Sequence, residues 1–359
     1  LFIEAMLKRG AEVNIVLPFD KEDFLQTSVA FAGKQWINRF NNALKLANTV
    51  TYVTEEKYLM TDILFDYTGR IFQGMAHLRA HIMLTVPHFL AVLDAGSNKI
   101  DGGTAATVSN LPDSVECTII DLEKIRKSCT PIEISAAEPV PDPVTENRKA
   151  ITKAAPSGAK RVIKAMLFGD IVGYSKLQEE HMDFLVSTFL SEVANKLGTI
   201  QNPDFINTWG DAIFAAMNSA SKMAEYALAL QGTIAEIDPK EHGVPYDLSM
   251  RIGLHSGPVF EKEDPFTHQN NLYGAHVNRA ARIEPITKSG SIYASEQFVA
   301  MLIEEKTRKV GFDMSKFPYS LNYVGTVPLA KNFGMQAVYL MESKLQPKNF
   351  TKIPTGGRA

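Results

Sequence analysis

The spacing of apolar residues over the first 130 positions switches repeatedly between the periods of helices and strands. Apolar residues recur three and four positions apart in the stretches 36–47 and 63–83, which predicts two amphipathic helices. Between and after them lie short apolar or β-branched runs, which predict strands. Strands that alternate with helices are typical of βαβ units around a parallel sheet, so we expect a Rossmann-like domain here. The predicted strands are residues 11–19, 49–54, 87–94 and 116–122.

The predicted first domain has several candidate positions for a nucleotide. Ligands of parallel sheets bind at the carboxyl ends of the strands, where this chain has Pro18-Phe19, Asp94 to Gly96 and the turn Gly102-Gly103-Thr104. Such a turn before a helix is compatible with a phosphate cradle, and also with an ordinary loop and helix cap, which is the commoner case. No complete GxGxxG or GxxxxGK(S/T) pattern occurs. The segment resembles the Rossmann-type nucleotide-sensor domains that precede bacterial signalling enzymes, and its ligand stays open.

The composition changes between this domain and the rest of the chain. Residues 131–160 have few large apolar side chains and hold five prolines, which indicates an extended or disordered linker. We therefore expect a Rossmann-like domain over 1–130, a second domain over 161–345 and a short tail over 346–359. Because the chain opens at Leu1 rather than Met, and on a helical pattern, we expect the first domain to be truncated at its N-terminus.

Charge and composition exclude several classes of protein. The 359 residues carry 37 Lys and Arg against 40 Asp and Glu, a formal net charge of −3, which argues against a generically basic nucleic-acid binder. Cys117 and Cys129 are the only cysteines, too few for a disulfide scaffold. No apolar run approaches the roughly 18 residues of a membrane span, and no signal peptide is evident. We expect a cytoplasmic protein without a membrane span.

The second domain opens with two segments in which an aspartate and a glycine share a turn. In FGDIVGYSKL (168–177), Asp170 closes an apolar strand and Gly173 lies in the turn that follows, so the backbone N–H groups there can face an anion. An aspartate beside such a cradle fits if a cation such as Mg²⁺ lies between them; a plain helix cap is the alternative. In NTWGDAIFA (207–215), two apolar strands flank Gly210-Asp211, which predicts a hairpin. Asp211 is then either a solvated turn residue or a second metal ligand.

Two further segments place polar residues in otherwise apolar elements. RIGLHSGPV (251–259) predicts a strand that contains His255, and no acid is placed to form a catalytic triad with it, so we interpret it as a structural histidine. YGAHVNRAARIE (273–284) predicts a helix with Asn278 and Arg282 four residues apart on one face. Arg282 either pairs with a nearby glutamate or grips phosphate oxygens with its planar fork, with Asn278 orienting a sugar.

Together these four segments, and VGTVPLAKNFGMQAVY (324–339) after them, resemble in order and spacing the catalytic domain of class III nucleotidyl cyclases over about residues 161–341. The resemblance implies a ferredoxin-like α+β core, in an α/β chain overall, and two such domains associated head to tail with active sites at their interface. It implies conversion of a nucleoside triphosphate to a 3′,5′-cyclic nucleotide and pyrophosphate.

The resemblance also assigns roles to individual residues. Two metal ions, Mg²⁺ or Mn²⁺, would be bound by Asp170 and Asp211 with the carbonyl of Ile171. The partner subunit of a homodimer would contribute Asn278 and Arg282 to catalysis. The phosphate-binding positions would be the backbone of Gly173, Tyr174 and Ser175, and Lys331 of the partner; the segment LAKNFG around that lysine departs from the commoner spacing.

The base-reading positions depart from the family pattern. Adenylyl members commonly have Lys and Asp three residues before the glycines of the second and fourth segments, and guanylyl members have Glu and a small residue. Here these positions are Asn207 and Asn271, whose amides can both donate and accept. Gln269, two residues before Asn271, resembles the residue of adenylyl members at this position and not that of guanylyl members. ATP is the expected substrate because it is the commonest one in the family, with GTP or a pyrimidine triphosphate as alternatives.

Two other functions stay open at this point. One is a catalytically silent cyclase-like domain that binds a nucleotide and regulates a partner. The other is a diguanylate cyclase, which has a related core, but WGDAIF lacks the second acid that its hairpin needs.

Overall fold

The computed structural model describes residues 1–54, 57–58, 62–94, 103–112, 115–128, 160–200, 202–311 and 313–344. Almost all of the expected linker, the expected tail, and the positions Gly96, Gly102 and Cys129 lie outside the described residues.

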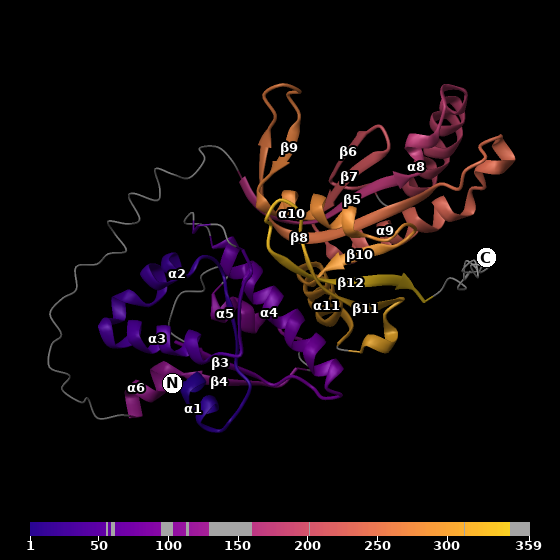
Figure 1. The fold of residues 1–359 in the computed structure, drawn as a ribbon. Helices are drawn as coiled ribbons and strands as arrows, with labels where there is room; N and C mark the ends of the chain where they lie inside the picture. Colours follow the sequence, from indigo (N-terminus) through magenta and orange to yellow (C-terminus); the bar gives the residue numbers. More distant parts are fainter. Residues whose placement is uncertain are drawn as a thin grey trace, which may run out of the picture.

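The N-terminal half alternates helices with parallel strands, as the periodicity predicted (Figure 1). β1 pairs in parallel with β2, and β3 in parallel with β4. Within the described residues these are two separate two-stranded sheets. The elements are α1 (Phe2–Lys8), β1 (Asn14–Leu17), α2 (Lys21–Ser28), η1 (Ala30–Ala32), α3 (Lys34–Leu46), β2 (Thr49–Tyr52), α4 (Ile63–Ile82), β3 (Phe89–Leu93), α5 (Thr104–Ser109), β4 (Cys117–Asp121) and α6 (Leu122–Ser128).

The C-terminal half is built on one eight-stranded sheet. Seven of its strands follow the order β11-β12-β10-β8-β5-β7-β6, and the eighth, β9, pairs with β8 outside that order. Its strands are β5 (Lys160–Val172), β6 (Phe205–Trp209), β7 (Ala212–Met217), β8 (Ser249–Glu263), β9 (Asn270–Tyr273), β10 (Ile292–Ser295), β11 (Tyr319–Pro328) and β12 (Met335–Ser343). The main helices are η4 (Phe184–Leu190), α8 (Ser191–Gly198), α9 (Ala220–Glu236), α10 (Ala275–Ile283) and α11 (Glu296–Val310), with short 3₁₀ turns at 174–176, 179–181, 239–242, 284–286 and 314–316.

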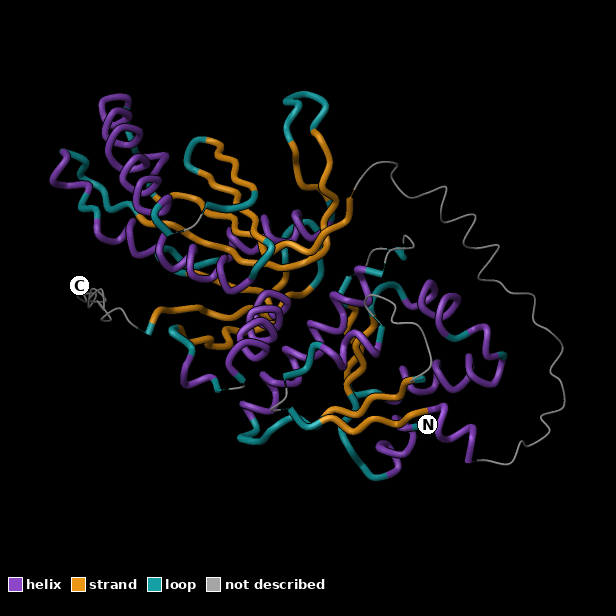
Figure 2. The backbone as a smooth tube through the Cα atoms, turned by 180° about the vertical axis from the view of Figure 1, so that it is seen from behind, coloured by secondary structure: helices purple, strands orange, loops and turns teal. Residues whose placement is uncertain are grey.

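Four of these strands form the ferredoxin-like core that the sequence predicted. β8, β5, β7 and β6 are antiparallel neighbours in that order, with α8 leading from β5 to β6 and α9 leading from β7 to β8. This is the βαββαβ arrangement, which leaves the ends of β5 and β7 side by side in the middle of the sheet. Seen from behind, the helices of the C-terminal half lie against this sheet (Figure 2).

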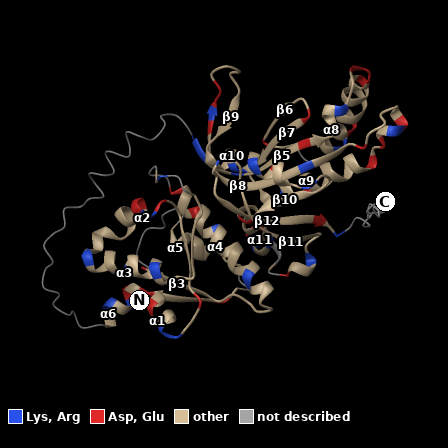
Figure 3. Ribbon diagram, in the orientation of Figure 1, with Lys and Arg blue, Asp and Glu red and all other residues tan. Residues whose placement is uncertain are grey.

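The two halves share one hydrophobic core, through α4. Tyr67, Ile71 and Leu78 of α4 belong to the same cluster of buried residues as Leu254 of β8 and Phe298 of α11. The apolar spacing of α4 predicted a buried face, and the structure shows that α11 of the other half covers it. Residues of both charges, Lys and Arg as well as Asp and Glu, are scattered over both halves (Figure 3).

Candidate functional site

The two motif aspartates lie next to each other at the end of the central strands. Asp170 is near the end of β5 and is paired in register with Ala212, the first residue of β7. Asp211 precedes that residue, in a two-residue turn whose Gly210 has a φ of 63°. The backbone N–H of Ile171 donates to the carbonyl of Asp211 at 3.2 Å. The antiparallel register of β5 and β7 therefore brings two aspartates that are far apart in the sequence to one place.

The electrostatics of this pair favour a cation. Burial raises the pKa of Asp211, and the neighbouring Asp170 carboxylate raises it further. Burial also raises the pKa of Glu284, and the negative charges of Asp170 and Asp211 raise it further. Close carboxylates that disfavour each other's ionised form are stabilised by a bound positive charge. The donor set therefore fits a divalent ion.

Arg251 supplies one positive charge to this acidic group. It faces Asp170 across the β5–β8 register and donates from Nη2 to Asp170 Oδ2 at 2.6 Å. Its Nε lies 2.8 Å from Glu284 Oε1. Within the described residues, no group of three His, Cys, Asp or Glu side chains is arranged to hold a metal by itself. Mg²⁺ often uses one or two carboxylates and completes its shell with backbone, water and substrate phosphate oxygens.

The expected phosphate turn follows Asp170 directly. Gly173 is in the left-handed region, with a φ of 99°, and a Cβ there would lie 3.2 Å from the carbonyl of Asp247. The chain then enters a 3₁₀ turn over Tyr174–Lys176 rather than a longer helix. The first N–H groups of such a turn have no partner within it, so those of Tyr174 and Ser175 can face an anion. The left-handed backbone angle favours glycine here, and an added Cβ would also make a tight contact with the neighbouring backbone.

α10 presents the predicted catalytic pair on its outer face. His276, Ala280 and Ile283 form its buried face, and at 100° per residue Asn278 and Arg282 project to the other side. Arg282 donates from Nη1 to the Asn278 carbonyl at 2.7 Å. The predicted alternative, a pairing of Arg282 with a glutamate, is not found among the described residues; the arginine that contacts Glu284 is Arg251.

Phe333 links this helix to the loop that carries Lys331. The Arg282 guanidinium carbon lies 3.7 Å from the centroid of the Phe333 ring, a cation–π contact. Lys331 and Asn332 both have positive φ, 59° and 58°, which is uncommon for residues other than glycine. The unusual LAKNFG sequence thus forms a tight left-handed turn that places an aromatic ring on Arg282. Nothing in the sequence pattern singles out Phe333, whose contact with Arg282 is visible only in the structure.

The three expected base-reading residues lie on two hairpins. Asn207, exposed on β6, folds its amide oxygen back onto the N–H of Thr208 at 2.9 Å. Asn271 on β9 donates to Asp264 at 3.3 Å, and Gln269 precedes that strand. Within the described part of the chain, no hydrogen bond joins these residues, or Asn278 and Arg282, to the aspartate pair. The predicted metal ligands and the predicted base-reading and catalytic residues are therefore two groups that no hydrogen bond between described residues joins.

His255 has a structural setting, as predicted. It is fully buried, with Nδ1 2.8 Å from Ser295 Oγ and Nε2 2.9 Å from His276 Nδ1. Burial lowers the pKa of His276 to about 3 and that of His255 well below its ordinary value, so both rings are neutral. The pair joins β8, α10 and the start of α11.

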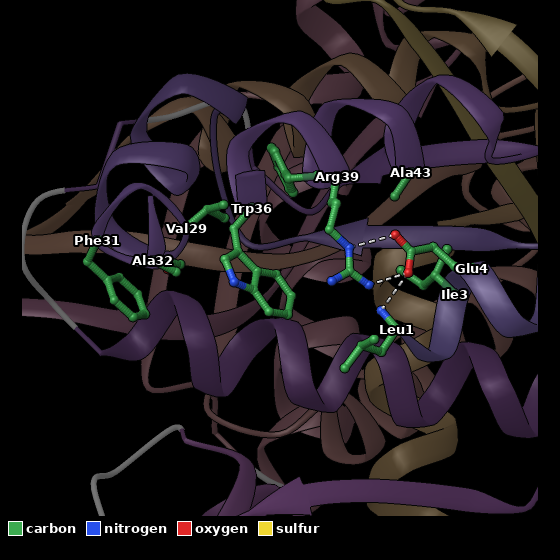
Figure 4. Close-up of a pocket in the computed structure, with 11 residues that line it drawn as sticks. Leu1, Ile3, Glu4, Val29, Phe31, Ala32, Trp36, Arg39 and Ala43 are labelled. Atoms are coloured by element: carbon green, nitrogen blue, oxygen red, sulfur yellow. Dashed lines mark hydrogen bonds and ion pairs between the residues drawn. The ribbon is translucent and has the colours of Figure 1, made fainter. Parts of the chain in front are cut away.

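A pocket in the N-terminal half lies apart from these motifs. It is lined by α1 and α3, where Arg39 pairs with Glu4 and lies over the Trp36 ring at 4.6 Å (Figure 4). The hydrogen bond from Arg39 lowers the pKa of Glu4 to about 2. None of the lining residues belongs to the motifs.

The described helices include none that is both long and apolar enough to cross a membrane.

Comparison with known proteins identifies the C-terminal half. Residues 160–318 match the family model described as the adenylate and guanylate cyclase catalytic domain. An adenylate cyclase of Podospora anserina is 29% identical over 155 residues, 38% of this chain and 7% of that protein. A putative adenylate cyclase 3 of Rhizobium meliloti is 29% identical over 142 residues, 38% of this chain and 23% of that protein. The adenylyl cyclase CyaB from P. aeruginosa has a structure with 17% identity and a TM-score of 0.43, covering 52% of this chain and 96% of that one.

By its motifs and its ferredoxin-like topology, the C-terminal half is a nucleotidyl cyclase catalytic domain of class III. The family model covers residues 160–318, which lie within this domain and not in the N-terminal half. It spans less than a quarter of the length of the two curated relatives described above.

Proposed function

We propose that this protein converts a nucleoside triphosphate, with ATP as the first candidate, to a 3′,5′-cyclic nucleotide and pyrophosphate. The observation that carries the proposal is the register of β5 and β7, which sets the Asp170 and Asp211 carboxylates beside each other, where burial and the Asp170 charge raise the pKa of Asp211 and a divalent cation is favoured. The 3′-oxygen forms a bond to the α-phosphorus, the bond from that phosphorus to the bridging oxygen breaks, and the 3′-hydroxyl proton passes to solvent or to a phosphate oxygen.

Asp170 and Asp211, with the carbonyl of Ile171, would hold the metal, as Mg²⁺ or Mn²⁺. When bound, two such ions polarise the 3′-hydroxyl and neutralise charge on the phosphates. Arg251 already neutralises part of the acidic group, because it bonds to Asp170 on one side and lies beside Glu284 on the other. It orients the Asp170 carboxylate before substrate arrives.

The backbone at Gly173, Tyr174 and Ser175 would hold the β- and γ-phosphates. The positive φ of Gly173 turns the chain so that the following N–H groups open the 3₁₀ turn. Backbone donors held by the fold do not have to reorganise during the reaction, which makes them effective for charge stabilisation.

The remaining groups would come from a second copy of the chain. Asn278 and Arg282 make no hydrogen bond to the aspartate pair of their own chain among the described residues, and Lys331 lies on the loop that Phe333 connects to Arg282. Ile206 and Trp209 on β6 are about half exposed, at 51% and 54%, which provides apolar surface for a partner. A head-to-tail homodimer would join the two halves of the site, and Arg282 would stabilise charge on the α-phosphoryl oxygens.

The amides of Asn207 and Asn271, together with Gln269, would face the base. Because an amide both donates and accepts, GTP or a pyrimidine triphosphate remains the competing substrate. A catalytically silent nucleotide-binding domain is the competing function.

A product assay separates these functions. Purified full-length protein is incubated with Mg²⁺ or Mn²⁺ and with ATP, GTP, CTP or UTP, and cyclic nucleotide is measured by mass spectrometry. We expect a cyclic product from one base in clear excess, and none from Asp170→Ala or Asp211→Ala, whose melting temperatures should stay near that of the wild type. Undiminished turnover by either variant would refute the metal assignment. Nucleotide binding without any product would support the silent domain instead.

A further inference from the structure

α4 makes contacts with the cyclase domain that resemble those of a core helix. At Gly74, an added Cβ would lie 1.9 Å from the carbonyl oxygen of Ala300, so the backbones of α4 and α11 are in direct contact. Arg70 donates to Glu304 and Glu305 of α11, each at 3.1 Å, and Glu304 is only 2% exposed. Glu305 also accepts the N–H groups that begin α9. α4 is thus held by backbone packing and by buried charge.

Tyr67, one turn before Arg70 on α4, connects this helix to strand β8 of the sheet. It is fully buried, and its hydroxyl donates to the carbonyl of Ser256 in β8 at 2.8 Å. β10 pairs with β8 only over Ile252–Leu254. Tyr67 therefore bonds to β8 just beyond the residues where β10 pairs with it.

The Tyr67 ring also packs on the back of the catalytic helix. It makes an edge-to-face contact with His276 of α10, with centroids 5.8 Å apart and planes at 78°. His276 has little freedom to move. A Cβ on Gly257 would lie 2.2 Å from its Nδ1, and His255 bonds to the same nitrogen at 2.9 Å. The imidazole is thus packed between the backbone of β8, His255 and Tyr67.

His276 is on the buried face of α10, and Asn278 and Arg282 are on its outer face. A displacement of the buried side of a short helix moves its outer side chains by a similar distance, because the helix is rigid over nine residues. Reactions that depend on oriented groups lose about 10²-fold for a misplacement of about 1 Å.

We propose that Tyr67 is a positioning residue for α10: a side chain of the N-terminal half that sets where Asn278 and Arg282 stand in the cyclase site. The proposal rests on the proposed function, because the reaction in which these two residues act is cyclisation. It gives the N-terminal half a direct physical route to catalysis, through Tyr67 and His276.

The test uses the full chain with Tyr67→Leu, which removes both the hydroxyl and the ring, and Tyr67→Phe, which removes only the hydroxyl. The matched control is Tyr226→Leu, since Tyr226 is equally buried in the same core cluster but lies on α9. Two quantities are measured: steady-state kcat and KM for the nucleotide, and amide hydrogen exchange of peptides that cover α10 and α9.

We expect Tyr67→Leu to lower kcat on the order of 10-fold or more with little change in KM, because Asn278 and Arg282 would be misplaced in the transition state. Exchange of α10 should accelerate while exchange of α9 stays unchanged. Tyr67→Phe should show the same pattern more weakly, and Tyr226→Leu should lose stability without a fall in kcat or faster exchange of α10. If both Tyr67 variants keep wild-type kcat and α10 exchange, or if Tyr226→Leu reproduces their effects, Tyr67 does not position α10.

Failure of the proposed function gives a different result. If the wild type makes no cyclic nucleotide, the cyclase assignment fails, yet hydrogen exchange still decides whether Tyr67 holds α10. If the wild type is active and the exchange of α10 ignores Tyr67, only the positioning role fails.

Discussion

The packing of α4 on α11 predicts a large effect for the smallest of substitutions, Gly74→Ala. The new Cβ would lie 1.9 Å from the oxygen, 2.5 Å from the carbon and 2.7 Å from the Cα of Ala300. Ordinary contact begins at 3.4 Å, so the helices must separate by 3.4 − 1.9, about 1.5 Å, or shift sideways by a similar amount. The obstacle is backbone, which has no rotamer that could relieve it.

The magnitude follows from two opposing terms. Alanine favours a helix interior over glycine by roughly 1 kcal/mol. Forcing an extra carbon into a close-packed interface costs typically about 1–3 kcal/mol, and more where the backbone itself must move. A separation of about 1.5 Å also weakens the dispersion contacts of the neighbouring side chains. We therefore expect a net loss of about 1–2 kcal/mol in the free energy of unfolding.

The assay compares urea unfolding midpoints of Gly74→Ala with two control glycines. Gly198, at the end of α8, has open space around an added Cβ, so Gly198→Ala should be neutral or slightly stabilising. Gly69 of α4 faces the Thr107 side chain, whose Oγ1 would lie 2.8 Å from the Cβ and can rotate away, so Gly69→Ala should cost less than Gly74→Ala. A Gly74→Ala protein with the wild-type midpoint would refute the docking of α4 on α11.

Two further predictions concern the shared site and the buried histidines. If the active site is built from two copies, a mixture of the inactive Asp170→Ala and Arg282→Ala proteins at equal concentration should regain up to about a quarter of wild-type turnover. This is the share of intact sites that random pairing of the two chains gives. No recovery, in a mixture shown to contain mixed dimers, would contradict the composite site. Burial lowers the folded-state pKa of His276 to about 3 and that of His255 well below the ordinary value, so the unfolded chain alone takes up these protons as the pH falls below about 6.5. The contribution of these histidines to the free energy of unfolding should be constant above that pH and should fall below it, by about 1.4 kcal/mol per histidine at pH 5.5. Urea unfolding at pH 7.5 and at pH 5.5 measures the difference. Equal unfolding midpoints at the two pH values would contradict the buried neutral pair.

Local patterns predicted the elements well because their causes are local. The apolar stripe of α4 and the β-branched run of β2 each set a period that the structure reproduces to within two residues. Gly210-Asp211 predicted a hairpin turn, and the strands on either side pair in that register. The absence of an acid near His255 predicted a structural role, which its two buried hydrogen bonds confirm.

What the sequence could not predict depends on contacts between distant segments. The stripe on α4 indicated burial but not its partner, α11, which is more than 200 residues away. Gly74 is an ordinary helix glycine until Ala300 is placed against it. Arg251 is the first residue of the segment RIGLHSGPV, yet its bond to Asp170 follows only from the β5–β8 register. Within the site, residue types and spacing predicted the candidates, and the tertiary contacts among them had to come from the structure.

These contacts change how the two halves of the chain relate. A regulatory domain on a flexible linker acts by changing local concentration or by steric exclusion. Here α4 bonds to β8 through Tyr67, to α11 through Arg70, and packs on His276 of α10. α4 cannot move closer to α11, because Gly74 and Ala300 leave no space between the backbones. If Tyr67 couples the position of α10 to that of α4, a ligand that binds the N-terminal half with different affinity in two positions of α4 shifts the position of α10 by at most that difference in binding free energy.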